Sequence, residues 1–334
     1  MSAFPEHVRS QWFPVALSAR VKRQPLRVLL LGEPVVLART STGQVLALED
    51  RCPHRGAPLS AGTVCGNALR CPYHGWVFDA AGRCLSMPGT DESAALGKPH
   101  IASYSTDERD GIIWAAREPR GPLPSRMRAL APAWQRFLWE TTWNAPIIEA
   151  QENFLDALHT HLVHPGLVRR DAVRRPVTAT LAAGEDGIQI DFAGQADQTG
   201  LLYRLFESTR TRERAYFSAL SVGQLEYRYA AGWAAYITLC FCPETTATTR
   251  VYALFHIEGR WAPRWLVRLV VWPFLRRVAS QDKRILDLQS RNLQAFSGHR
   301  HIVTTLDIVR PHLEHAWRGG ALRDTQTTST IIYI

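Results

Sequence analysis

The chain has 334 residues, which is longer than one average domain and leaves room for two compact units with separate cores. Hydrophobic residues make up 46% of the sequence and charged residues 21%, a composition typical of a folded globular protein and not of a disordered one. The formal net charge of +9 comes mostly from arginines scattered through both halves of the chain, without a basic arm or repeated basic patch. We therefore expect no nucleic-acid partner.

The first twenty residues, MSAFPEHVRSQWFPVALSAR, lack an apolar run behind a basic start. We therefore expect a cytoplasmic protein whose six cysteines are kept reduced. A disulfide is then the least favoured use of Cys52, Cys65 and Cys71, and metal binding by these cysteines gains weight.

In chain order, residues 12 to about 117 form short apolar or alternating runs separated by turns that contain glycine, a pattern that predicts a small antiparallel β domain. The segment 121–125, GPLPS, breaks regular structure with two prolines and a glycine and predicts a linker. We place the domain boundary there, which gives domains 1–122 and 123–334.

The second half of the chain is mixed. A helix is predicted from about Pro146 to His161, and strand-like runs follow between residues 177 and 259. Two further helices are predicted over 261–278 and 280–297. The fold class is therefore α+β.

The segment Trp265 to Leu275, WLVRLVVWPFL, is apolar except for one arginine. It is too short to span a bilayer, and Pro273 interrupts it. We expect a buried helix that lines a pocket, without membrane contact, and an interfacial membrane contact is the alternative.

Four possible metal ligands lie close together near residue 60. Cys52 and His54 form a C-x-H arm, and Cys71 and His74 form a C-x2-H arm. Two thiolates and two imidazoles could close a tetrahedral zinc site, but a one-residue spacer is tighter than the usual zinc-finger spacings.

The two arms, CPHRGAPL and CPYHGWVFD, resemble the two cluster-binding loops of Rieske iron–sulfur domains. The resemblance implies a [2Fe–2S] cluster in which Cys52 and Cys71 hold one iron, while His54 and His74 hold the other. Imidazole ligands remove negative charge from a cluster and raise its reduction potential, which suits an electron relay.

Other residues of these loops have expected roles too. Gly56 and Gly75 would let the backbone come close to the cluster and donate N–H groups to its sulfurs. Cys65 and Cys84 have no such partners, and we expect them to be buried thiols.

The segment 152–164, ENFLDALHTHLVH, carries a second group of polar residues. Asn153, Asp156 and His159 recur at i, i+3 and i+6, which predicts that they share one face of a helix. His164 follows His159 by five residues, a spacing that indicates a local bulge or the end of the helix.

This run resembles the mononuclear-iron motif N-x2-D-x2-H-x4-H of Rieske non-heme iron oxygenases. The resemblance implies that His159 and His164 bind Fe(II), and that Asp156 is the carboxylate that connects this iron to a Rieske histidine. Asn153 matches the family's asparagine near the iron. A structural hydrogen bond is at least as well supported for this residue as a catalytic role. His161 lies outside the motif, and we interpret it as an ordinary polar or pocket contact.

A carboxylate as third ligand would complete a facial triad that leaves positions open for O2. Asp282 shares a helix face with an apolar row that begins at Leu286, so we expect it to point inward. Asp287 lies among basic residues, and ion pairing in solvent explains it. We choose Asp282, in agreement with the resemblance, because the family's carboxylate ligand opens a C-terminal helix.

The resemblance covers almost the whole chain and implies the terminal oxygenase α subunit of this family, similar to its ring-hydroxylating and O-demethylase monooxygenase branch. It implies an N-terminal antiparallel β Rieske domain and a C-terminal catalytic domain with a curved antiparallel sheet covered by helices. It also implies a homotrimer, in which the cluster of one subunit feeds the iron of its neighbour. The expected reaction is hydroxylation or oxidative demethylation, by O2, of a mostly apolar or aromatic small molecule.

No G-x-G-x-x-G fingerprint or C-x4-C-x2-C segment occurs in the sequence, which predicts a separate NAD(P)H-dependent reductase, a ferredoxin, or both. An electron carrier with a non-catalytic ligand-binding domain and a zinc-binding interaction protein are the alternatives. For the substrate pocket we expect walls from the helix around 265–274 and from aromatic strand residues, namely Tyr216, Phe217, Tyr227, Tyr229, Trp233 and Tyr236.

Overall fold

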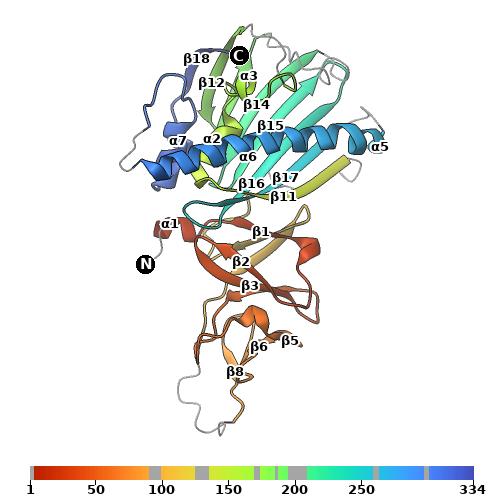
Figure 1. Ribbon diagram of the computed structural model, residues 1–334, viewed down its shortest axis with the longest axis vertical. Helices are drawn as coiled ribbons and strands as arrows, with labels where there is room; N and C mark the ends of the chain where they lie inside the picture. Colours follow the sequence, from red (N-terminus) through yellow and green to blue (C-terminus); the bar gives the residue numbers. More distant parts are fainter. Residues whose placement is uncertain are drawn as a thin grey trace. The chain divides into compact units, whose positions relative to one another are not determined.

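The computed structural model describes residues 4–89, 99–124, 135–168, 174–184, 187–194, 209–258, 263–296 and 301–334. Ser125, the last residue of the expected linker, lies outside these ranges. The chain divides into two compact units (Figure 1). The first comprises Met1–Leu123 with Cys242–Thr246, and the second comprises Pro124–Phe241 with Ala247–Ile334.

The first unit consists of short antiparallel strands in three small sheets, as the sequence predicts. In spatial order these are β1 (Phe13–Leu17), β10 (Ile112–Ala116) and β9 (Ser105–Arg109); β2 (Leu26–Leu30), β3 (Glu33–Arg39) and β4 (Val45–Glu49); and β5 (Thr63–Cys65), β6 (Ala68–Arg70), β7 (Val77–Phe78) and β8 (Cys84–Ser86). Short helical turns are α1 (Glu6–Arg9), η1 (Ser18–Arg20) and η2 (Leu59–Ala61). Cys84 is buried in the core of this unit, as expected, whereas Cys65 is only half-buried.

The second unit is built on one eight-stranded sheet whose paired strands run antiparallel. In spatial order it contains β11 (Gln135–Trp143), β17 (Thr249–Glu258), β16 (Ala234–Pro243), β15 (Val222–Tyr229), β14 (Arg210–Ser218), β13 (Gly187–Ala193), β12 (Pro176–Ala183) and β18 (Thr328–Tyr333). Because side chains alternate between the two faces of a strand, each strand contributes every second residue to the face that the helices cover.

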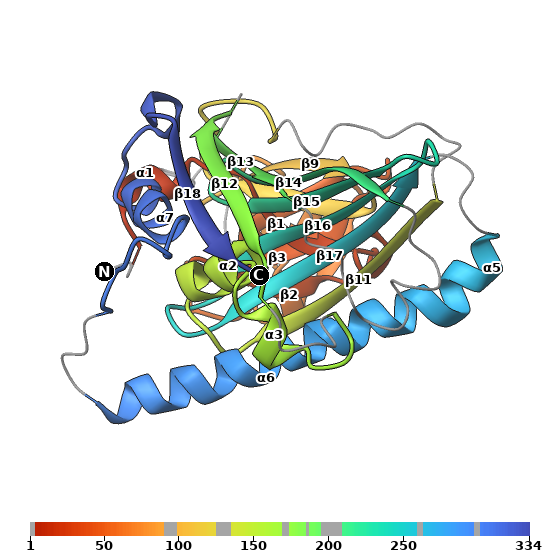
Figure 2. The same ribbon diagram turned by 90° about the horizontal axis from the view of Figure 1, so that it is seen from above.

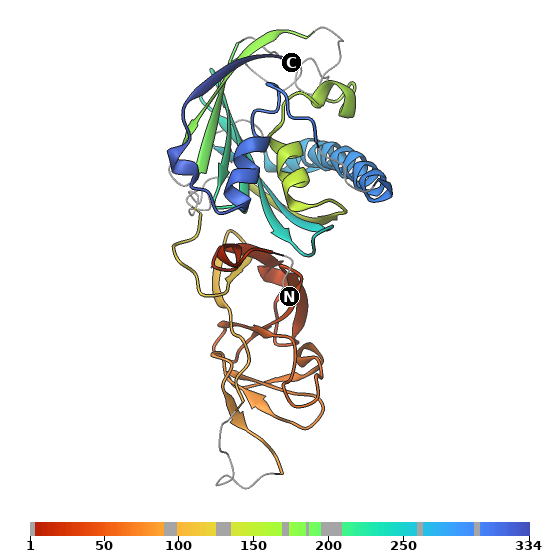
Figure 3. The ribbon, with the colours of Figure 1, turned by 90° about the vertical axis from the view of Figure 1, so that its left-hand side faces the viewer.

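Helices lie against one face of this sheet (Figures 1 and 3). Seen from above, the longest helix lies along one side of the sheet (Figure 2). The helices are α2 (Ile147–Leu155), α3 (Thr160–Val163), α5 (Arg264–Leu266), the π-helix η5 (Val267–Val271), α6 (Trp272–Ala295), α7 (Arg310–Trp317) and the 3-10 turn η6 (Leu322–Asp324). The α+β prediction, with a helix-covered antiparallel sheet, is therefore confirmed.

The helix that contains Asp282 differs from the prediction. The expected helices over 261–278 and 280–297 are one continuous stretch from Arg264 to Ala295, because nothing around Ser280 interrupts the backbone hydrogen bonding. Residues 261, 262 and 297 lie outside the described part of the chain.

The expectation of a buried helix that lines a pocket at Trp265–Leu275 holds for one face of the helix only. One face, which includes Val267 and Trp272, packs on the aromatic core of the sheet, but Trp265 and Leu269 are 64% and 69% exposed. Within the described residues, no helix combines the length and the apolar composition needed to cross a bilayer.

His256 on β17 gives the fold a built-in sensitivity to acid. Its side chain is buried, and burial, together with the charge of Arg136 on the neighbouring strand, lowers its pKa from 6.5 to about 3. The unfolded chain therefore binds a proton at mildly acidic pH that the folded chain does not bind. The contribution of the neutral imidazole to the free energy of unfolding is fully present above pH 6.5. It is lost as the pH falls from 6.5 towards 3.

We predict that a His256→Gln variant loses less stability on acidification than the unchanged protein. Between pH 7 and pH 5, the free energy of unfolding should fall by about 2 kcal/mol more in the unchanged protein than in the variant, because glutamine at position 256 does not titrate. Urea unfolding of both proteins at the two pH values measures it. Identical pH dependence in both proteins would contradict the assignment.

Candidate functional site

Asp156 ends the helix that was expected to continue to His161. The helix α2 stops at Leu155, and Asp156 adopts an extended backbone conformation. Its side chain then accepts backbone hydrogen bonds from Leu158 (Oδ1, 2.8 Å) and His159 (Oδ2, 3.3 Å). Such a turn competes with helix continuation, since the aspartate side chain satisfies the N–H groups at the start of a new turn. The prediction of one shared helix face is therefore wrong.

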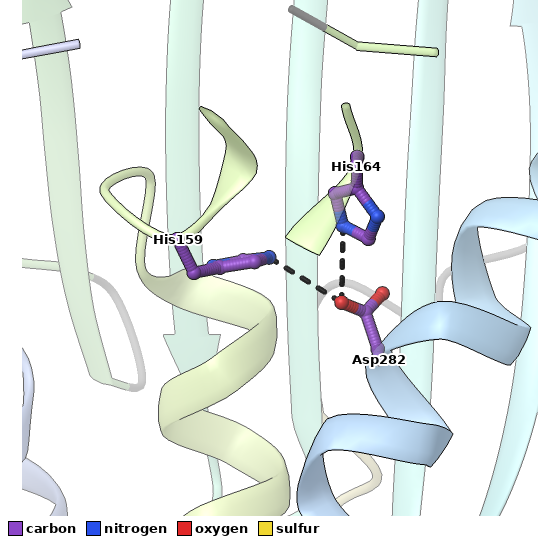
Figure 4. A group of neighbouring side chains, drawn as sticks. All are labelled: His159, His164 and Asp282. Carbon is purple, nitrogen blue, oxygen red and sulfur yellow. Dashed lines mark ion pairs between the residues drawn. The ribbon is translucent and has the colours of Figure 1, made fainter. Parts of the chain in front are cut away.

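The break brings three possible metal ligands together. Oδ1 of Asp282 lies 3.0 Å from Nε2 of His164 and 3.4 Å from Nε2 of His159 (Figure 4). The three ligand atoms all lie within 4.8 Å of one another. His159 precedes the short helix α3 and His164 ends it, while Asp282 comes from the middle of α6 and not from its start. The expectation that this aspartate opens a helix is thus corrected.

The other ring nitrogen of each histidine also has a partner. Nδ1 of His164 lies 3.0 Å from Oε1 of Gln281, an amide oxygen that can only accept, so a proton on Nδ1 is held there and Nε2 can bind a metal. Nδ1 of His159 lies 3.5 Å from Oδ2 of Asp156. Groups that orient ligating imidazoles in this way are typical of metal sites. Gln281 directly precedes Asp282 in the chain, but no sequence pattern predicts this role for it.

Electrostatic interactions hold the three side chains together. Burial lowers the pKa of His159, but hydrogen bonds and charges from Asp156 and Asp282 outweigh it and raise the pKa to about 9. Burial raises the pKa of Asp282, and the two histidines more than reverse this effect and lower it. Two imidazole nitrogens and one carboxylate oxygen are the donor set of the facial triad that binds Fe(II), so the residues fit a mononuclear iron.

The other polar residues considered in the sequence do not belong to the triad. Asp287 pairs with Arg291 (Oδ2 to Nη2, 2.7 Å) and accepts a hydrogen bond from Asn144, as its charged surroundings predict. His161 is half-buried and is not one of the converging residues. Asn153 lines the cavity beside the triad.

The first unit holds the cysteine and histidine arms. The thiols of Cys52 and Cys71 are buried in the core, and burial together with the neighbouring Cys71 thiol raises the pKa of Cys52. His54 and His74 are exposed, with ring centroids 4.5 Å apart, and Trp76 stacks on the His54 ring at 4.7 Å. Buried thiols and exposed imidazoles form two separate pairs, which fits a [2Fe–2S] cluster with one pair on each iron.

A single zinc ion fits these four residues less well. Tetrahedral zinc needs all four donor atoms around one point. In the described ranges of the chain, only the triad of His159, His164 and Asp282 brings three such atoms within 4.8 Å of one another.

The glycine after the first arm has a different role from the expected one. The Gly56 N–H donates to the Cys52 carbonyl oxygen (2.9 Å), so it closes a turn instead of facing a cluster sulfur. Its φ is 73°, and Gly75 has a φ of 75°, conformations that other residues rarely adopt. The backbone conformation therefore explains both glycines.

A cavity of about 130 Å³ adjoins the triad. Its wall is mostly apolar and is formed, besides the triad, by Trp139, Trp143, Asn153, Phe154, Leu155, Asp156, Ala157, Thr160, Val168, Phe192, Glu213, Leu225, Tyr227, Ile237, Leu239, Leu254, Phe255, Leu275, Val278 and Ala279.

Of the aromatic strand residues expected in this wall, only Tyr227 lines it among the described residues. Tyr216, for example, donates a hydrogen bond to Glu226 (2.7 Å), and Tyr229 stacks on Trp233. From the long helix, the cavity is lined by residues beyond Phe274, beginning at Leu275. The sequence analysis missed Trp139 and Trp143 because the register of a strand decides which of its residues face inward.

A network of buried charges fixes the helices that carry the triad. Arg310 of α7 binds Glu149 (2.9 Å) and Glu152 (2.6 Å) of α2, and Gln289 of α6 donates to the same Glu149 (3.1 Å). Arg310 and Glu149 are almost completely buried, and breaking such a buried pair typically costs about 3–5 kcal/mol. The network ties α2 to α6, the two helices that lead to the histidines and to Asp282. A second cavity of about 660 Å³ lies beside this network and is also lined by Asp156 and His159.

We predict that an Asp282→Asn variant binds Fe(II) or Co(II) at least about 100-fold more weakly, because it loses the carboxylate, the anionic ligand among the three. Metal titration under anaerobic conditions measures the affinity. Asp287→Asn is the matched control, since it removes an acid from the same helix outside the triad. Equal weakening in both variants would contradict the proposed ligand set.

Two protein families match successive parts of the chain. The model of the Rieske [2Fe-2S] domain matches residues 11–105, and the model of the vanillate O-demethylase oxygenase C-terminal domain matches residues 139–310. Methylxanthine N1-demethylase NdmA of Pseudomonas putida is 34% identical over 183 residues, 48% of this chain and 48% of NdmA. The oxygenase component of dicamba O-demethylase of Stenotrophomonas maltophilia is 33% identical over 174 residues, 50% of this chain and 51% of that protein. These alignments span about half the length of the relatives.

Solved structures agree over a longer part of the chain. The structure of NdmA from Pseudomonas putida CBB5 has a TM-score of 0.72 and 25% identity, and covers 94% of this chain and 90% of NdmA. Dicamba monooxygenase bound to dicamba has a TM-score of 0.74 and 22% identity, and covers 93% of this chain and 96% of that protein, a likeness in fold. The chain belongs to the Rieske oxygenases, a family that combines a Rieske [2Fe–2S] domain with a catalytic domain that uses a mononuclear non-heme iron.

Proposed function

We propose that the chain is a terminal oxygenase component, which uses O2 and electrons from a separate protein to hydroxylate or oxidatively demethylate a mostly apolar or aromatic small molecule. The observation that carries this proposal is the convergence of His159, His164 and Asp282 beside a mostly apolar cavity. An electron carrier with a non-catalytic binding module would leave three converging metal ligands without a purpose.

In this proposal, one domain transfers electrons and the other holds the site of oxidation. Residues 1–122 form the Rieske domain, in which Cys52 and Cys71 hold one iron of the cluster and His54 and His74 hold the other. Residues 123–334 form the catalytic domain, in which His159, His164 and Asp282 hold the mononuclear iron. Asp156 contacts His159 directly, which supports its role as the carboxylate through which electrons reach this site.

Mononuclear iron bound to a facial triad supplies O2 activation at its open coordination positions. The chain's own residues prepare the site for this chemistry. Gln281 and Asp156 orient the two imidazoles so that Nε2 faces the metal position, and the apolar wall excludes water from the reacting carbon. Asn153 lies in the same wall, where its amide can position a polar group of the substrate.

The overall reaction consumes one O2, two electrons and two protons. One oxygen atom enters a C–H bond of the substrate and the other leaves as water. If that carbon is an O- or N-methyl group, the hydroxylated carbon collapses to the demethylated product and formaldehyde. The names of NdmA and dicamba O-demethylase support this branch for the present chain.

The proposal includes partners and assembly. Electrons come from an NAD(P)H-dependent reductase, a ferredoxin, or both, and the oxygenase is a homotrimer, as the family resemblance implies. None of the six cysteines forms a disulfide, which supports a cytoplasmic location.

The function is tested by measuring O2 uptake and formaldehyde with a surrogate reductase and a panel of methoxy- and N-methyl-substituted aromatic compounds. We expect uptake that depends on substrate, from protein that shows the visible and EPR spectra of a Rieske cluster. A His159→Ala variant should keep the cluster spectra and lose turnover, because it lacks one iron ligand. His161→Ala is the matched control, since it removes a neighbouring histidine outside the triad. Unchanged turnover in His159→Ala, or colourless protein, would contradict the proposal.

A further inference from the structure

One acidic side chain of the cavity wall belongs neither to the triad nor to its orienting residues. Glu213 lies on β14, directly opposite Phe192 of β13 and Tyr227 of β15. Directly opposed residues of neighbouring strands point to the same face of a sheet. All three line the cavity beside the triad, so a carboxylate lies between two aromatic rings in an otherwise mostly apolar wall.

Apart from the two histidines of the triad, the described wall residues carry no basic side chain. They include the acids Asp156, Glu213 and Asp282, but no lysine or arginine. Arg210 pairs with Glu213 (Nη1 to Oε2, 2.9 Å), and its guanidinium lies 4.3 Å from the centre of the Tyr227 ring, yet Arg210 is not one of the lining residues. This pairing holds the carboxylate in place and leaves its second oxygen able to accept a hydrogen bond.

The size of the cavity limits what can reach this carboxylate. A volume of about 130 Å³ is close to that of an apolar cavity of roughly 150 Å³ that accepts benzene. One aromatic ring therefore matches the space of this cavity, which shares Asp156 and His159 with the larger cavity of about 660 Å³. An anionic substituent would be buried beside Glu213 in a mostly apolar site, which is unfavourable, whereas an N–H or O–H group would satisfy the carboxylate.

We propose that Glu213 determines substrate specificity by selecting uncharged single-ring aromatic molecules with an N–H or O–H donor, and by rejecting carboxylates and sulfonates of the same shape. This inference rests on the proposed function of the same cavity. It differs from a purely structural role of the Arg210–Glu213 pair, which would affect stability but not the preference between two ligands.

Two probes of equal shape test the inference, 4-methoxybenzamide and 4-methoxybenzoate. Their dissociation constants are measured by calorimetric titration of the protein with its metal centres, without reductant, so that no turnover occurs. We expect the amide to bind at least about tenfold more tightly than the carboxylate. In Glu213→Gln, which keeps an oxygen for Arg210 and removes the charge, the preference should fall to within about twofold.

Asp191→Asn is the matched control. Asp191 also pairs with an arginine of β14, Arg214, but it lies on the opposite face of the sheet and does not line the cavity. This variant should keep the full preference for the amide. Tighter or equal binding of the carboxylate by the unchanged protein, an unchanged preference in Glu213→Gln, or no binding of either probe at millimolar concentration would overturn the inference. Because binding is measured without O2 uptake, a failure here is separate from a failure of the oxygenase proposal.

Discussion

The carboxylate of Asp282 lies between two imidazoles in a largely buried position, and the rest of the catalytic unit depends on this contact. A buried carboxylate is costly unless a charge, a hydrogen bond or a metal compensates it. The compensation requires that α6 stays continuous through Asp282 and that α2 ends early enough for both histidines to reach it. Arg310 and Gln289 meet that requirement by joining both helices to the same buried Glu149. The geometry of three ligands thus rests on a charge network outside the site.

The two faces of the eight-stranded sheet carry different kinds of side chain, and this difference determines the polarity of the cavity wall. On the face opposite the helices, charged residues pair with one another across strands, as Asp191 does with Arg214. On the helix-covered face, apolar and aromatic residues predominate among the described strand residues, so the acid Glu213 stands out. Gly223 on the same face lets Phe154 of α2 approach closely, since a Cβ there would lie only 2.9 Å from the Phe154 ring. Backbone spacing and strand alternation therefore set both the depth and the polarity of the cavity.

Much of this protein could be predicted from sequence because most of its expected metal ligands are close together in the chain. The Rieske arms and the segment 152–164 each place their donors within a few residues, and helical periodicity separated Asp282 from Asp287. The break at Asp156 was missed because its spacing to His159 also suits a continuous helix. Trp139 and Glu213 were missed because only strand register decides which face they occupy. Gln281 was missed because no pattern marks the residue that orients a ligand.

The two-centre account is tested most directly by the iron and acid-labile sulfide content of the purified protein. A Rieske [2Fe–2S] cluster together with a mononuclear iron predicts about three irons and about two sulfides per chain. Equal numbers of iron and sulfide, even after anaerobic incubation with Fe(II), would show a cluster without a mononuclear site and would contradict the account.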